Sequence, residues 1–91
     1  MQIEKILIIE SPIQLAKMIE SRPEILDRSS DEDYMLLRYF CDSVDLFVKG
    51  CKCDEEENYS EMMESYSRIQ SDSESISHLA SCIGCDRIEF K

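Results

Sequence analysis

The chain has 91 residues, and its 20 acidic residues against 10 basic ones give a formal net charge of −10 at pH 7. This length predicts a single domain, 1–91, and excludes a two-domain architecture. The charge argues against direct binding to nucleic acid, because contact with phosphates requires clustered Lys and Arg. A chain this short buries only about 60–65% of its unfolded surface, so a metal, a crosslink or a partner would add to its stability.

We expect neither an export signal nor a membrane helix. The apolar run 6–9 is preceded by Glu4 and Lys5, whereas a membrane helix requires about 20 apolar residues. The five cysteines, in the absence of such a signal, favour a reducing compartment in which thiols stay free or bind metal. The sequence therefore predicts an intracellular reducing location, no disulfide framework and no contact with a membrane.

The first helix is predicted over residues 12–20. Ser11 before Pro12, with Gln14 three residues after the serine, is typical of a helix start. Pro23 is expected to stop this helix, because a residue that precedes proline is disfavoured in the α region.

The second predicted helix, 31–49, is the longest. Ser29 and Ser30 precede three acidic residues, which favour the positive end of a helix dipole, and Gly50 is suited to a left-handed cap. The apolar residues recur at helical spacing, so we expect this helix to form the centre of the fold. They are Leu36, Leu37, Phe40, Cys41, Val44, Phe47 and Val48.

Two further helices are predicted in the second half of the chain. The third covers 54–71, starts with four acidic residues, and has an apolar face opposite a face of Glu and Ser. The fourth covers 73–83 and is followed by Gly84. The apolar positions of the two helices are Tyr59, Met62, Met63, Tyr66 and Ile69, and then Ile76, Leu79, Ala80 and Ile83.

The C-terminal segment 86–91 alternates between apolar and charged residues, as a half-buried strand does, with Ile88 and Phe90 on one side. Residues 6–9 fit either a helix or a strand, and as a strand they are a possible partner for this segment. The predicted fold is thus mainly α, a compact four-helix bundle with at most a short two-stranded pairing of the chain ends.

Four cysteines in two close pairs suggest a structural zinc site, because four thiolates satisfy tetrahedral zinc. If the second, third and fourth helices run up, down and up, the two pairs meet at one end of the bundle. The alternatives are that these cysteines are ordinary reduced thiols or that they include an oxidised pair. Cys41 is expected to be core packing. The candidate ligands are Cys51, Cys53, Cys82 and Cys85, with His78 as a possible replacement for one thiol.

Nothing in the sequence predicts catalysis. His78 is the only histidine and is expected at the surface, no Ser/His/Asp set can be selected, and two glycines do not suffice for a phosphate-binding loop. Residues 54–74, by contrast, hold eight acidic residues against one basic residue, Arg68. The candidate partner-binding acids in this window are Asp54, Glu55, Glu56, Glu57, Glu61 and Glu64.

We therefore predict a non-catalytic, acidic protein-interaction or assembly module. Its partner would be a protein with a basic surface or sister subunits of an assembly. Two alternatives stay open. One is a DNA-mimic inhibitor of a nucleic-acid-acting host enzyme, and the other is a zinc-stabilised binding module.

The order of features in residues 36–91 resembles that of small uncharacterised proteins of tailed bacteriophages. An apolar helix ends in Cys51-Lys52-Cys53, a polar helix follows, and the chain closes on the sequence 85–90, CDRIEF. The resemblance implies no activity. It implies a virion component or an accessory factor, located in the virion or in the host cytoplasm.

Overall fold

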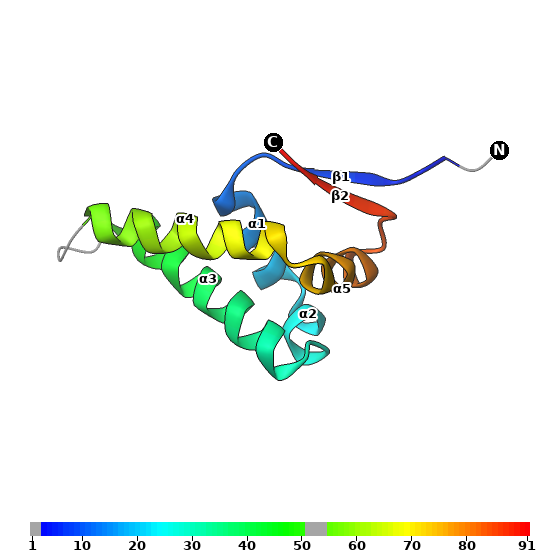
Figure 1. The fold of residues 1–91 in the computed structure, drawn as a ribbon, viewed down its shortest axis with the longest axis horizontal. Coiled ribbons are helices and arrows are strands. Elements are labelled where there is room, and N and C mark those ends of the chain that lie inside the picture. Colours follow the sequence, from blue (N-terminus) through cyan, green and yellow to red (C-terminus); the bar gives the residue numbers. More distant parts are fainter. Residues whose placement is uncertain (1–2, 51–54) are drawn as a thin grey trace.

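The computed structural model describes residues 3–50 and 55–91. Within them the chain is mainly helical, as predicted, and the two chain ends form a small sheet (Figure 1). The elements in chain order are β1 (Ile6–Ile9), α1 (Pro12–Ser21), α2 (Pro23–Asp27), α3 (Asp31–Lys49), α4 (Glu55–Ser71), α5 (Ser73–Ile83) and β2 (Arg87–Phe90).

Local side-chain bonds set where the helices begin. The hydroxyl of Ser11 accepts a hydrogen bond from the Gln14 amide at 3.1 Å, and the hydroxyl of Ser30 accepts one from the Asp33 amide at 3.2 Å. Asp72 does the same for α5, accepting from the Glu74 amide at 3.0 Å. Each cap accepts a hydrogen bond from a backbone N–H that has no partner within the first helical turn. Residues close in the sequence therefore determine where these helices begin.

Two glycines end helices as predicted. Gly50 after α3 has φ 62° and Gly84 after α5 has φ 85°. Both lie in the left-handed region, which glycine enters without steric cost.

The described residues contain five helices, one more than the four predicted. Pro23 does follow the end of α1, but it also occupies the first position of α2. Proline is favoured there because its fixed φ suits a helix and the missing N–H is not needed in the first turn. The residue that stops one helix therefore starts the next.

The helices are arranged around an antiparallel pair formed by α3 and α4 (Figure 1). Helix α5 lies beyond the C-terminal end of α4 and contacts α2, at the opposite end of the long axis from the C-terminal end of α3. The up-down-up course, which was the condition for the two cysteine pairs to meet, is not adopted, because α5 does not return alongside α3. None of the helices in the described parts of the chain combines the length and apolarity needed to cross a membrane.

Strands β1 and β2 pair in parallel, with Ile6 opposite Arg87 and Ile9 opposite Phe90. This confirms the predicted pairing of the chain ends and settles the ambiguous segment 6–9 as a strand. Over residues 3–50 and 55–91 the sheet consists of these two strands.

The Gln14 side chain blocks part of the outer edge of β1. Its amide accepts a hydrogen bond from the Glu10 backbone at 2.8 Å and donates one to the Ile8 carbonyl at 3.1 Å. These are the bonds that a neighbouring strand would make, so this side chain protects an edge that would otherwise invite pairing.

One apolar core joins the seven elements of the described chain. The periodicity of the sequence predicted most of it, including Cys41, while Val48 and Tyr59 are exposed although their spacing predicted packing. The buried apolar residues are Ile9, Leu15, Ala16, Ile19, Ile25, Leu37, Phe40, Cys41, Val44, Met62, Tyr66, Ile69, Leu79, Ala80 and Ile88.

Candidate interaction surface

The predicted acidic surface lies on α4. The side chains of Glu56, Glu57 and Glu64 are exposed, and Glu61 is half-buried. Asp54 and the side chain of Glu55 lie outside the described residues. The predicted acids that the structure describes are therefore exposed or half-buried.

The opposite side of α4 is anchored in the core. Tyr66 stacks on Phe40 with ring centroids 5.8 Å apart and meets Phe90 edge-on at the same distance. Burial raises the pKa of Tyr66, whose hydroxyl finds no hydrogen-bond partner among the described residues. The hydroxyl of Ser65 is satisfied within the helix, donating to the Glu61 and Met62 carbonyls. This packing directs the acidic side of α4 outward.

Two adjoining hollows, which share Leu36, Arg68 and Asp72 in their linings, lie where α3, α4 and the start of α5 meet. We call them together the three-helix groove. It combines exposed apolar side chains from α3 with charged side chains from all three segments. Its lining residues are Glu32, Met35, Leu36, Tyr39, Glu64, Ser67, Arg68, Ser71 and Asp72.

A smaller hollow lies at the other end of the α3–α4 pair, lined by Phe47, Glu56, Tyr59 and Ser60. The rings of Phe47 and Tyr59 are 5.7 Å apart and tilted by 55°. Together with the exposed Leu46 and Val48, these two rings form what we call the hairpin end.

Beside the three-helix groove, a buried polar contact fixes α5 against α3. The hydroxyl of Ser75 lies 2.8 Å from Oδ1 of Asp33 and 3.0 Å from Oδ2 of Asp72, and it has one hydrogen to share between them. Ser75 is fully buried and Asp33 is 8% exposed. Because buried polar groups are costly without partners, this contact specifies how the two helix starts meet.

His78 is half-buried, which corrects its predicted surface position. Its Nε2 lies 2.6 Å from the carbonyl of Ile25, and because a carbonyl only accepts, Nε2 carries the hydrogen. The bond joins α5 to α2. We call the group formed by Ile25, Asp33, Asp72, Ser75 and His78 the junction.

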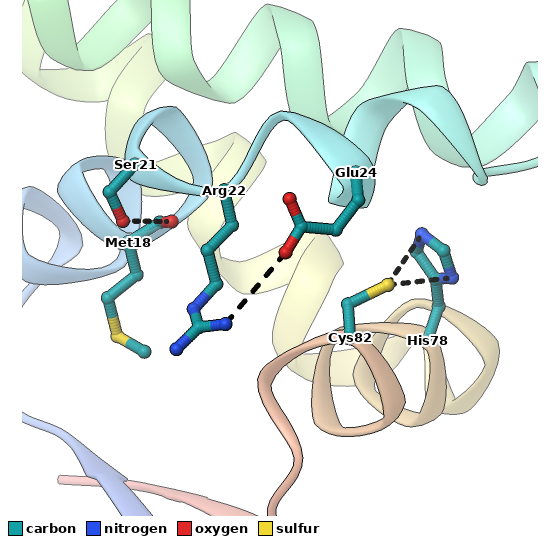
Figure 2. A network of polar contacts seen from close by, with 6 residues as sticks. All are labelled: Met18, Ser21, Arg22, Glu24, His78 and Cys82. Atoms are coloured by element: carbon teal, nitrogen blue, oxygen red, sulfur yellow. Dashed lines mark hydrogen bonds and ion pairs between the residues drawn. The ribbon is translucent and has the colours of Figure 1, made fainter.

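Figure 2 shows the sulfur of Cys82 turned toward the His78 ring, 3.9 Å from both ring nitrogens. An ion pair of Arg22 with Glu24, at 3.8 Å, lies nearby between α1 and α2. Both of these charged side chains are exposed, so the pair adds little to stability.

The predicted zinc site lies partly outside the described residues, because Cys51 and Cys53 belong to the segment 51–54. Cys82 and Cys85 are half-buried, free thiols. In residues 3–50 and 55–91, no three His, Cys, Asp or Glu side chains are placed to hold a metal ion.

Cys41 is a different kind of thiol. Burial raises its pKa from 9.0 to about 12, and the nearby charges of Glu20 and Asp42 act in the same direction. A thiol with this pKa stays protonated and unreactive, which agrees with its predicted role in the core.

Met35 and Tyr39, in the apolar wall of the three-helix groove, were not predicted as part of a binding surface, whereas Leu36 beside them belongs to the predicted apolar stripe. Met35 is 71% exposed and Tyr39 is 46% exposed. Their spacing in the sequence could have identified them, because they are apolar residues four positions apart on α3 and lie outside the stripe that predicted the core.

No family model, no curated protein and no solved structure matches this chain. The resemblance to small bacteriophage proteins therefore stays a prediction.

Proposed function

We propose that this protein is a non-catalytic interaction module whose acidic surface binds a basic region of a protein partner. The observation that carries the proposal is the outward position of Glu56, Glu57 and Glu64 on α4, a helix whose other side is fixed in the core. A fixed cluster of one charge sign attracts a partner of the opposite sign and discriminates against wrong partners. The setting that we propose, a virion or accessory protein of a bacteriophage, rests on the sequence resemblance alone.

The first test uses a fluorescently labelled oligolysine peptide as the probe. Affinity is measured by anisotropy at low and at physiological salt for the wild type and for the triple variant Glu56→Gln, Glu57→Gln, Glu64→Gln. We expect the variant to bind several-fold more weakly at low salt, and the difference to shrink as salt screens the charges.

The matched control is the triple variant Glu10→Gln, Glu20→Gln, Asp27→Asn, which removes the same charge from exposed positions away from α4. It should retain most of the affinity. Equal losses in both variants would mean that net charge alone attracts the probe, and unchanged affinity in the α4 variant would refute the proposal.

The DNA-mimic alternative is distinguished by competition. A basic DNA-binding protein is bound to a labelled duplex, and the wild-type protein is added. Displacement of the duplex, lost in the α4 variant, would identify the acidic surface as a DNA mimic rather than as a general protein-binding surface.

A further inference from the structure

The three-helix groove has an apolar wall that nothing in the described chain covers. Met35 and Tyr39 lie one turn apart on α3, and the half-buried Leu36 lies between them at the base. Methionine adapts its shape to different partners, and tyrosine offers a large contact area at low entropic cost. Exposed apolar side chains that adjoin one another and are bordered by polar residues are a feature of protein contact surfaces.

The rim of the groove is acidic. Glu32 and Asp72 line the part of the groove that holds Met35 and Tyr39, and Glu64 lines the adjoining part beside Leu36. Among the described lining residues, Arg68 is the one base. The net charge of the lining is therefore negative, and it belongs to a chain that carries −10 overall. An acidic rim around an apolar wall is complementary to a partner segment that presents apolar residues flanked by Lys or Arg.

The shape of the groove favours a helix over an extended strand as the occupant. Its apolar wall follows α3 from Met35 to Tyr39, about 6 Å at the helical rise of 1.5 Å per residue. Apolar residues at positions i and i+4 of an incoming helix, one turn apart, span the same length. A strand would need an exposed sheet edge, and the wall is a helix surface.

We infer that the three-helix groove binds the apolar face of a cationic amphipathic helix from a partner protein. This inference rests on the proposed function and specifies it. The wall formed by Met35, Leu36 and Tyr39 receives the apolar residues, and the acidic rim receives the flanking Lys or Arg side chains.

The probe is a labelled synthetic helix of about 16 residues with leucines at helical spacing and lysines elsewhere. A second peptide has the same composition in an order that forms no apolar face. Both peptides carry the same charge, so the ratio of their affinities measures the contribution of the apolar face. We expect the amphipathic peptide to bind the wild type at least about tenfold more tightly than the scrambled one.

The groove is tested with the double variant Met35→Ser, Tyr39→Ser, which should reduce the ratio of affinities to near one. The control is Leu46→Ser, Val48→Ser, which removes apolar side chains that are 40% and 59% exposed at the hairpin end of the same helix. It should leave the ratio unchanged. Because all four side chains are exposed, both variants should keep the helical circular dichroism spectrum and thermal unfolding of the wild type.

The outcomes separate the two proposals. Equal binding of the two peptides to the wild type would overturn the groove assignment and leave the charge-based function standing. If the ratio of peptide affinities fell to near one in Leu46→Ser, Val48→Ser but not in Met35→Ser, Tyr39→Ser, the groove assignment would be overturned. The contact would then lie at the hairpin end. Absence of binding by both peptides at low salt would overturn both proposals.

Discussion

The two ends of the α3–α4 pair are built differently. At the junction, buried hydrogen bonds join α3, α2 and α5, with His78 bonded to the Ile25 carbonyl and Ser75 bonded to Asp33. At the hairpin end, Phe47 and Tyr59 touch over a surface that solvent also reaches. Buried polar bonds allow few geometries, whereas exposed apolar contacts allow many. The junction therefore fixes the fold, and the hairpin end tolerates change.

The largest effect is expected for Ile25→Ala at the junction. Ile25 is fully buried between α2 and the rest of the core, so the variant leaves a cavity and should lower the free energy of unfolding by about 2–4 kcal/mol. Urea denaturation measures this loss. Ile25→Val, which removes one methylene group, should cost about 1 kcal/mol. If Ile25→Ala lowered the free energy of unfolding by less than about 1 kcal/mol, the junction would not be tightly packed.

Ser75→Ala should cost about 1–3 kcal/mol, because it leaves the buried Asp33 carboxylate without its hydroxyl donor. Ser73→Ala, on the exposed side of the same first turn, is the matched control and should change stability by less than about 0.5 kcal/mol. Equal effects of the two substitutions would show that helix propensity, and not the buried bond, accounts for the loss.

Cys41, which lies between the two ends on α3, predicts a pH dependence. The folded protein keeps the thiol proton up to a pKa of about 12, whereas the unfolded chain releases it near 9.0. The unfolded state binds fewer protons in this range, so the contribution to stability is complete below pH 9 and is lost as the pH rises toward 12.

The measurement is the midpoint of urea unfolding at several pH values between 8 and 11. The wild type should lose stability more steeply than Cys41→Ala, because all other titrating groups are shared by the two proteins. If the unfolding midpoint fell equally with pH in the wild type and in Cys41→Ala, burial would not be protecting the thiol from deprotonation. A thiol reagent at pH 8 gives a second readout, and it should modify Cys82 and Cys85 before Cys41.

The smallest effect is expected at the hairpin end. Val48→Ser removes an apolar side chain that is 59% exposed, and the two residues have similar helix propensities, so stability should change by less than about 0.5 kcal/mol. Thermal unfolding followed by circular dichroism suffices as the measurement. A loss as large as that of Ser75→Ala would erase the contrast between the two ends.

Much of the candidate surface was predictable from residue order, but its apolar half was not. The acids of α4 could be located because an amphipathic helix turns its charged side to solvent. Met35 and Tyr39 look like additional apolar positions of a central helix, and only the course of α4 and α5 leaves them uncovered. His78 was misplaced for the related reason that its partner, Ile25, is 53 positions away in the sequence.

The sequence by itself determined the helices and their ends. Caps such as Ser30 and Gly50 act within one turn of their own position, and the backbone bonds of a helix join residues four apart, so neighbouring residues contain this information.

Only the tertiary structure decided how these elements meet. The parallel pairing of β1 with β2, the position of α5 on α2, the Asp33–Ser75 bond and the three-helix groove all join segments that are distant in the chain. These arrangements depend on how the apolar faces of all the helices pack at once, a property that no single segment carries.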